Sequence, residues 1–234
     1  MTSESEKPNA PLPPDLLITI DGPAGSGKTT VSRLLAGHLG YHYVDTGALY
    51  RCIALEAQKA GTDTNDDKQL AQLCAGLDIQ FRELDAQWRL YSNGIDIGDD
   101  IRTPAVTMLA SAISAMPSVR RHLLQVQRSL GAKKSAVFEG RDMGTVVFPG
   151  ADVKFYLDAD IGVRAQRRYA ELSNHAQSKA EVEADMQKRD HDDRHRKLAP
   201  LKPADDAIVI DTTNLSIAEV VQTMLNKIRQ NFHS

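Results

Sequence analysis

Leu16-Leu-Ile-Thr-Ile20-Asp21-Gly22-Pro23-Ala24-Gly25-Ser26-Gly27-Lys28-Thr29-Thr30 is the stretch of sequence that decides the fold of this chain. Its apolar beginning predicts a short buried strand. The glycines that follow can take positive φ angles, with which a loop turns successive backbone N–H groups toward an anion. The stretch therefore predicts a strand that leads into a phosphate-binding loop.

A helix is predicted directly after this loop. A phosphate held by the loop would then lie at the N-terminus of the helix, where the free N–H groups and the partial positive charge favour anions. The apolar residues that recur at helical spacing are Val31, Leu34, Leu35 and Leu39.

The end of the loop carries the residues that a nucleoside triphosphate requires. Lys28 is placed to reach the β- and γ-phosphates, and Thr29 offers a hydroxyl to Mg²⁺. Thr30 carries a second hydroxyl, so the residues leave open which of the two meets the metal. The alternative is a glycine-rich turn that ends in Lys-Thr by chance, and it does not explain the flanking strand and helix. We therefore predict a site for a nucleoside triphosphate and Mg²⁺.

The chain has 234 residues, of which 41% are hydrophobic, and a net charge of −3. This length and apolar content suffice for one substantial core with a small inserted lobe. No stretch approaches the ~20 apolar residues of a membrane span. Residues 1–14 are polar, acidic and rich in proline, unlike a signal peptide, and predict a disordered tail. We expect a cytoplasmic monomer with no membrane partner. Cys52 and Cys74 have neither the spacing of metal ligands nor that of a CxxC motif, so we expect two reduced thiols.

The charge pattern allows two interpretations. The acidic balance argues against a dedicated nucleic-acid binder. Basic residues are nevertheless dense in 164–168 and in 188–197, where aspartates are interleaved with them. Such mixed runs are typical of solvated helix faces. A second phosphorylated substrate beside the triphosphate would instead require converging cations, because the two anions repel each other.

Apolar segments alternate with helical patterns along the chain, which predicts an α/β fold with a parallel sheet flanked by helices. Sites in such sheets lie at the carboxyl ends of the strands. The last helix is marked at its start by Ser216 and Glu219, which form a capping box. The sheet has about five expected strands, at Leu16–Ile20, His42–Val44, Ala136–Glu139, Val153–Leu157 and Ala207–Ile210.

Two regions interrupt the alternation. Residues 63–100 predict a short helix at Lys68–Ala75 and then an antiparallel hairpin of Asp78–Arg82 and Trp88–Ser92, which we interpret as an inserted α+β lobe. Residues from about 173 to 203 are charged and poor in large apolar side chains, which favours a mobile lid. The phosphate-binding core would then comprise 15–62 and 101–234.

Three further clusters follow predicted strands or lie in the lid: DTGALYR at 45–51, EGRDMG at 139–144 and RDHDDRHR at 189–196. At these points the chain resembles bacterial cytidylate kinases, which are nucleoside monophosphate kinases. The resemblance runs from the phosphate-loop strand to the final helix and leaves out only the N-terminal tail. It implies transfer of the γ-phosphoryl group of Mg-ATP to CMP or dCMP, and a nucleotide-binding role for the inserted lobe.

The resemblance also implies roles for particular residues. Arg51 would hold the CMP phosphate together with Thr46, and Asp142 would read the cytosine. Glu139 stands where relatives commonly carry aspartate, and its role is left open. The implied catalytic residues are Lys28, Arg141 and Arg189, and the implied substrate residues are Thr46, Arg51, Ser111, Arg120, Arg141, Asp142, Arg189, Asp193 and Arg196.

The roles of these residues can be weighed against the chemistry of the base and against other functions. Cytosine presents an amino donor beside ring acceptors, so a carboxylate or hydroxyl paired with an arginine can distinguish it from uracil. A GTPase would need an Asn-Lys-x-Asp motif, but Asn226-Lys227 is followed by Ile and Arg. A nucleic-acid-binding module would explain the arginines and leave the complete phosphate loop unexplained. A kinase for another nucleoside monophosphate is the nearest alternative.

Overall fold

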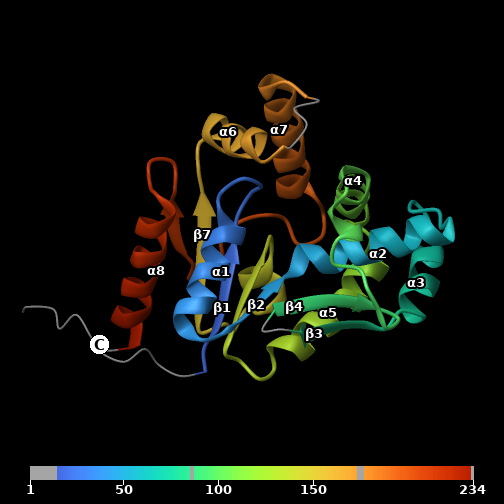
Figure 1. Ribbon diagram of the computed structural model, residues 1–234, viewed down its shortest axis with the longest axis horizontal. Helices are drawn as coiled ribbons and strands as arrows, with labels where there is room; N and C mark the ends of the chain where they lie inside the picture. The colour runs from blue at the N-terminus through green and yellow to red at the C-terminus, as the bar shows by residue number, and fades with distance from the viewer. Residues whose placement is uncertain (1–14, 85–86, 173–176, 233–234) are drawn as a thin grey trace, which may run out of the picture.

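The computed structural model describes residues 15–84, 87–172 and 177–232 of the chain. The prediction of a disordered tail over 1–14 lies outside this part, as do residues 173–176 of the predicted lid. Figure 1 shows a central sheet with helices on both sides, a helical lobe beside it and two helices above the ends of its strands.

The main sheet has five parallel strands, as expected, in the order β2-β6-β1-β7-β8. Because β1 is the middle strand, the loop that follows it emerges from the centre of the sheet. Each expected strand is present to within one residue at either end. The strands are β1 (Leu17–Asp21), β2 (His42–Asp45), β6 (Ala136–Gly140), β7 (Val153–Asp158) and β8 (Ile208–Asp211).

Helices cover both faces of this sheet. In β1, Ile18 and Ile20 pack toward α1 (Lys28–Leu39) and α8 (Ile217–Phe232), while Leu17 packs on the opposite face with α5 (Pro117–Gly131) and the π-helical turn η2 (Met143–Val147). This alternation is expected of a strand whose successive side chains point to opposite faces. The predicted capping box is confirmed, because the N–H of Ser216 donates to Glu219 Oε2 at 2.8 Å and the N–H of Glu219 to Ser216 Oγ at 3.3 Å.

The predicted hairpin is confirmed as an antiparallel pair and is extended by a third short strand that the sequence did not indicate. The side chains of this segment share one apolar cluster with the helices on either side of it in the chain. The division of the chain at residues 63 and 100 therefore stays a prediction. The elements of this lobe are α2 (Thr46–Ala60), α3 (Asp67–Ala75), β3 (Ile79–Leu84), β4 (Gln87–Ser92), β5 (Ile95–Asp96), η1 (Asp100–Arg102) and α4 (Pro104–Ile113).

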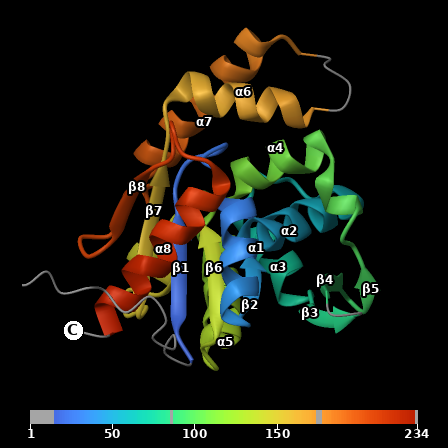
Figure 2. The same ribbon diagram turned by 60° about the vertical axis from the view of Figure 1, so that its left-hand side comes forward.

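Two helices lie beyond the carboxyl ends of the strands, where Figure 2 shows them above α4 and the end of β1. They are α6 (Ile161–Glu171) and α7 (Lys179–His195), and α7 begins at a capping box of Ser178 and Glu181. The basic run at 164–168 is helical, as predicted, and the run at 188–197 lies on α7 as far as His195. No helix among the described residues combines the length and the apolar character needed to cross a bilayer.

Candidate functional site

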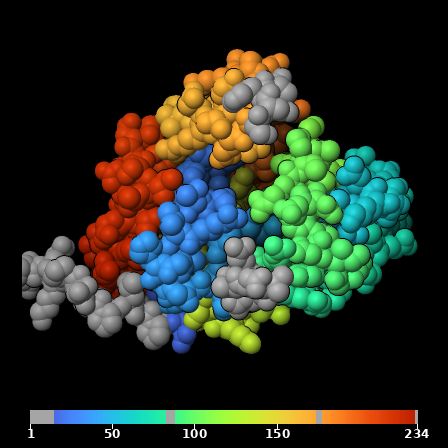
Figure 3. All heavy atoms as spheres, in the orientation of Figure 1, coloured from blue at the N-terminus to red at the C-terminus, as the bar shows by residue number. Residues whose placement is uncertain are grey.

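A cavity of about 450 Å³ lies between the phosphate loop, α2, α4 and α7, and it brings together almost every residue predicted for the site. Figure 3 shows the hollow between α6, α7 and α4 on the surface of the molecule. Gly22, Pro23 and Ser26 of the loop do not line it. The predicted residues that do are Ala24, Gly25, Gly27, Lys28, Thr29, Thr30, Thr46, Arg51, Ser111, Arg120, Arg141, Asp142, Arg189, Asp193 and Arg196.

The phosphate loop has the backbone geometry that its glycines predicted. Gly22 has a φ of +148°, and a Cβ placed there would lie 2.0 Å from the carbonyl oxygen of Leu157. Gly27, with a φ of +87°, is the last residue before α1 begins at Lys28. The loop therefore ends at a helix N-terminus whose free N–H groups suit an anion.

Lys28 is buried beneath this loop. Its Nζ donates hydrogen bonds to the carbonyl oxygen of Pro23 at 2.5 Å and to Ser26 Oγ at 3.3 Å. Burial, together with the positive charge of Arg141, lowers the pKa of Lys28 well below its ordinary value. An anion in the loop would reverse this effect, because it would replace lost solvation with a direct charge partner.

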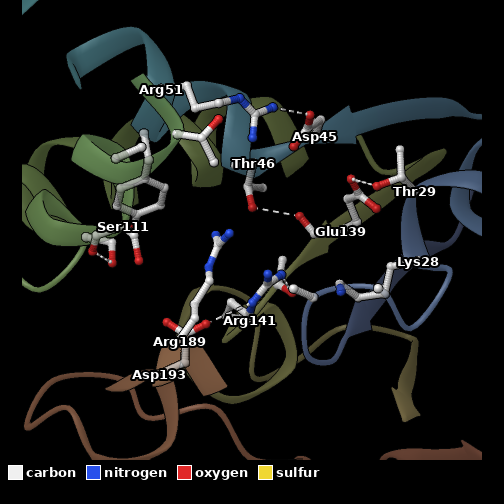
Figure 4. Close-up of a pocket in the computed structure, with 18 of the residues that line it drawn as sticks. Lys28, Thr29, Asp45, Thr46, Arg51, Ser111, Glu139, Arg141, Arg189 and Asp193 are labelled. Atoms are coloured by element: carbon white, nitrogen blue, oxygen red, sulfur yellow. Dashed lines mark hydrogen bonds and ion pairs between the residues drawn. The ribbon is translucent and has the colours of Figure 1, made fainter. Parts of the chain in front are cut away.

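Two guanidinium groups stand at the middle of the cavity. Arg141 Nε donates to Asp193 Oδ2 at 3.1 Å. Burial, followed by the nearby Arg141, lowers the pKa of Arg189 to about 10, and its buried Nε has no hydrogen-bond partner among the described residues. Figure 4 shows the Arg189 side chain extending from α7 into the open space beside Arg141. Two adjacent guanidinium groups with a donor that is still free in the described part of the chain are suited to bind phosphate.

One carboxylate organises the opposite end of the cavity. Asp142 is 2% exposed and lies between two arginines, forming a short ion pair with Arg120 and a second with Arg196 at 3.4 Å. Tyr50 lines the same region, and burial raises its pKa to about 12. Ser111 is present on α4 at this end, where its carbonyl oxygen accepts a hydrogen bond from Ser114 Oγ at 2.7 Å. These groups offer both donors and acceptors to a planar ring.

Arg51 and Thr46 come from the first two turns of α2. Arg51 pairs with Asp45 Oδ2 at 2.7 Å, and the hydroxyl of Thr46 donates to the carbonyl oxygen of Glu139 at 2.6 Å. Asp45 also caps α2, because its side chain accepts from the N–H of Ala48. The order Asp-Thr-x-x-x-x-Arg thus places the threonine and the arginine beside the cavity (Figure 4).

Glu139 is the acidic group nearest to the predicted metal ligand. Its Oε1 accepts hydrogen bonds from Thr29 Oγ1 at 2.9 Å and from the Tyr43 hydroxyl at 2.8 Å, while its buried Oε2 has no partner among the described residues. Burial and the neighbouring Asp45 raise the pKa of Glu139. A hydrated divalent cation fits here, because it would supply the positive charge that this carboxylate lacks. In the described part of the chain no three His, Cys, Asp or Glu residues form an all-protein metal cluster.

Asp21 at the end of β1 holds the segment that carries Arg141 and Asp142. Its carboxylate accepts hydrogen bonds from the N–H groups of Met143 at 2.9 Å and Gly144 at 2.8 Å. Burial nevertheless raises the pKa of Asp21 to about 6. The strand that leads to the triphosphate loop therefore also positions the residues on the other side of the cavity.

Asp21 gives the stability of the protein a defined pH dependence. Between its ordinary pKa and about 6, the folded protein keeps a proton that the unfolded chain has released, so the stability falls as pH rises through this range. From about pH 4 to about pH 6 the wild type should lose about 2 kcal/mol of unfolding free energy relative to Asp21→Asn. Urea unfolding of both proteins across this range measures the difference, and parallel pH profiles would contradict it.

The sequence did not single out several residues of the cavity. Tyr50 lies within the DTGALYR motif and Arg168 within the basic run at 164–168, so the sequence pattern could have pointed to both as site residues. No motif or charge run marks Arg102. His191 and His195 of α7 are exposed and stack on each other with ring centroids 4.1 Å apart. Cys52 and Cys74 are buried free thiols, as predicted.

Comparison with known proteins agrees with this arrangement. A family model described as cytidylate kinase matches residues 18–230. Cytidylate kinases from Geobacter sp. (strain M21) and Geobacter sulfurreducens are 46% and 48% identical over 217 residues, which cover 92% of this chain and 93% of each relative. A solved shikimate kinase from Acinetobacter baumannii, in complex with shikimate, shares the fold, with a TM-score of 0.50, 17% identity, and coverage of 94% of this chain and 97% of its own. The chain therefore belongs to the cytidylate kinase family.

Proposed function

We propose that this protein transfers the γ-phosphoryl group of Mg-ATP to CMP or dCMP and forms CDP or dCDP reversibly. The observation that supports this most directly is one cavity with a phosphate loop at one end, a carboxylate between two arginines at the other, and in the middle Arg141 beside Arg189, whose Nε has no hydrogen-bond partner among the described residues. That order matches a donor triphosphate, a transferring phosphoryl group and an acceptor nucleotide in line.

The chemistry asks mainly for alignment and charge stabilisation. A phosphate monoester has a second pKa of about 6, so the acceptor oxygen is already a nucleophile at neutral pH and no general base is needed. Lys28, Arg141 and Arg189 would surround the phosphoryl group and stabilise its negative charge in the transition state. Closure of the lid would exclude water that otherwise hydrolyses ATP.

We propose Thr29 and Glu139 as the residues that would hold Mg²⁺, which would supply positive charge to neutralise the phosphates of the bound nucleotide. The hydroxyl of Thr29 already lies 2.9 Å from Glu139 Oε1. Glu139 would contact the hydrated ion through the carboxylate oxygen that has no partner among the described residues. Thr30 is the alternative hydroxyl at the same helix start.

Replacing each threonine separately tests this assignment. Thr29→Val should raise the Mg²⁺ concentration that supports half-maximal turnover by ~10-fold or more, because the variant loses a ligand and the orientation of Glu139. Thr30→Val is the matched control and should leave that concentration unchanged. Titration of Mg²⁺-dependent ATP binding gives a readout that does not depend on turnover. The reverse pattern would assign the metal to Thr30.

We propose that Asp142 and its two arginines read the base. The carboxylate can accept from the amino group of cytosine while a guanidinium donates to its ring acceptors. Uracil presents the opposite pattern at that edge, so its entry would leave buried groups without partners. A mismatch of this kind can lower kcat/KM by orders of magnitude.

The defining experiment is ADP release by purified protein with Mg-ATP and, in turn, CMP, dCMP, UMP, AMP and GMP. Turnover with CMP and dCMP alone would support both the chemistry and the roles of Ser111, Arg120 and Asp142. Turnover with another monophosphate would keep the kinase and overturn those assignments. The lack of any acceptor-dependent turnover would overturn the proposed function. The monomeric state, the cytoplasmic location and the domain boundaries stay predictions from the sequence.

A further inference from the structure

Arg164 is a buried arginine that the proposed chemistry does not use. It lies on α6 and is 4% exposed. Its Nε donates to the carbonyl oxygen of Ala159 at 2.9 Å, and its Nη1 donates to the carbonyl oxygen of Ala24, in the phosphate loop, at 3.1 Å. The same Nη1 lies 2.6 Å from Asp190 Oδ2 on α7. One guanidinium group thus joins the end of β7, the phosphate loop and the lid helix.

The lid helix also packs directly on the phosphate loop at this point. Met186, one turn before Asp190, belongs to a small apolar cluster that Ala24 packs against. A Cβ placed at Gly25 would lie 2.9 Å from both Met186 Cε and the carbonyl oxygen of Arg164. The loop and α7 are therefore in close contact, and the ion pair lies within that contact.

Asp190 is the neighbour of Arg189 in sequence. Successive residues of a helix point about 100° apart, so the orientation of one side chain about the helix axis determines the orientation of the next. Asp190 is turned toward Arg164 and is 6% exposed. This leaves Arg189 turned into the cavity, where Figure 4 shows it. The Arg164–Asp190 pair thus sets the rotation of α7 that aims Arg189.

We propose that Arg164 and Asp190 are positioning residues that couple the lid to the phosphate loop, so that Arg189 meets the transferring phosphoryl group only while α7 is held against the loop. This inference rests on the proposed kinase function and deepens it. Neither residue lines the cavity, and both contact other protein groups. Because they act through Arg189, their loss should lower kcat, should leave KM nearly unchanged and should have no effect once Arg189 is removed.

The test is a double-mutant cycle. A misplacement of ~1 Å can cost ~10²-fold in rate, so Asp190→Asn should lower kcat ~10²-fold and change the KM values for ATP and CMP less than ~3-fold. In an Arg189→Ala background, Asp190→Asn should change kcat less than ~3-fold, because the group that it positions is gone. Asp192→Asn, at an exposed position of the same helix, is the matched control. A normal kcat in Asp190→Asn, or losses that multiply in the double variant, would overturn the proposal.

A second measurement separates this proposal from the proposed function. Hydrogen exchange of α7 should be faster in Asp190→Asn than in the wild type and in Asp192→Asn, whether or not CMP is an acceptor. Unchanged exchange would overturn the coupling, while a wild type without acceptor-dependent turnover would overturn only the kinase assignment. If Asp190→Asn does not fold, Asp190→Glu keeps the charge and displaces it by one methylene. Asp190→Glu should lower kcat ~10-fold in the wild type, and it should not lower kcat further in the Arg189→Ala background.

Discussion

Arg189→Ala should lower kcat by ~10³-fold or more, the effect of removing an arginine that stabilises a transferring phosphoryl group. The affinity for ATP should change far less, because the loop backbone and Lys28 remain. The physical reason is that Arg189 is buried, carries a depressed pKa beside Arg141 and has a donor without a partner among the described residues. A phosphoryl group would therefore meet a cation that Asp193 balances only in part and that keeps a donor free within the described part of the chain. Steady-state turnover together with equilibrium ATP binding measures both quantities.

Arg194→Ala is the control for this variant. Arg194 lies on the same helix, has a side chain 47% exposed and pairs with Asp158 only at 3.8 Å. Loss of such a surface pair changes little, so turnover should stay near that of the wild type. A near-normal kcat in Arg189→Ala would remove Arg189 from the proposed catalytic set. An equal loss in both variants would point to general disturbance of α7.

Asp142→Asn should lower kcat/KM for CMP by ~10³-fold and narrow the preference for CMP over UMP, because a buried site that no longer matches its substrate loses selectivity by such factors. The side chain of Asp142 is 3% exposed and serves two arginines. An amide neither balances their charge nor distinguishes a donor from an acceptor, since it offers both. The ratio of kcat/KM values for CMP and UMP measures the effect.

This substitution also leaves two buried guanidinium groups without an ionised partner, so the thermal unfolding midpoint should fall. Circular dichroism at the assay temperature must therefore accompany the kinetics. Asp152→Asn is a suitable control, because Asp152 is ion-paired with Lys134 at 2.8 Å and does not line the cavity. A folded Asp142→Asn with an unchanged CMP to UMP ratio would refute the base-reading role.

The secondary structure was largely predictable from the sequence because its signals are local. Short apolar runs, positive-φ glycines and the Ser216–Glu219 capping box each act within a few residues, and the corresponding elements are confirmed. The strand at Ile95–Asp96 was missed because two residues carry no periodicity. The apolar cluster that unites residues 63–100 with α2, α4 and α5 was also not foreseen, since it arises from side chains far apart along the chain.

The composition of the site was predictable for a related reason. Part of the site lies at or just after the ends of strands, and the carboxyl ends of parallel strands meet at one edge of the sheet. The site residues on α4, α5 and α7 were instead predicted through the resemblance to cytidylate kinases. Asp45 ends β2, the loop follows β1 and Arg141 follows β6, so the convergence of these three needed only the fold class. The specific partners were not predictable. Asp142 meets Arg196 across a separation of 54 residues, and the mixed-sign run on α7 gave no indication that Asp190 would be buried against Arg164.

The sequence by itself determined the strand-loop-helix order, the phosphate loop and the cation-rich chemistry of this protein, because these depend on residue type and short-range spacing. Only the tertiary structure decided the strand order, the partners of each charged side chain and the contact between α7 and the loop. Ion pairs form where packing brings side chains together and excludes water, and that depends on the whole chain at once. The pairing of Arg164 with Asp190 is therefore a property of the fold that the pattern of charges along the sequence does not contain.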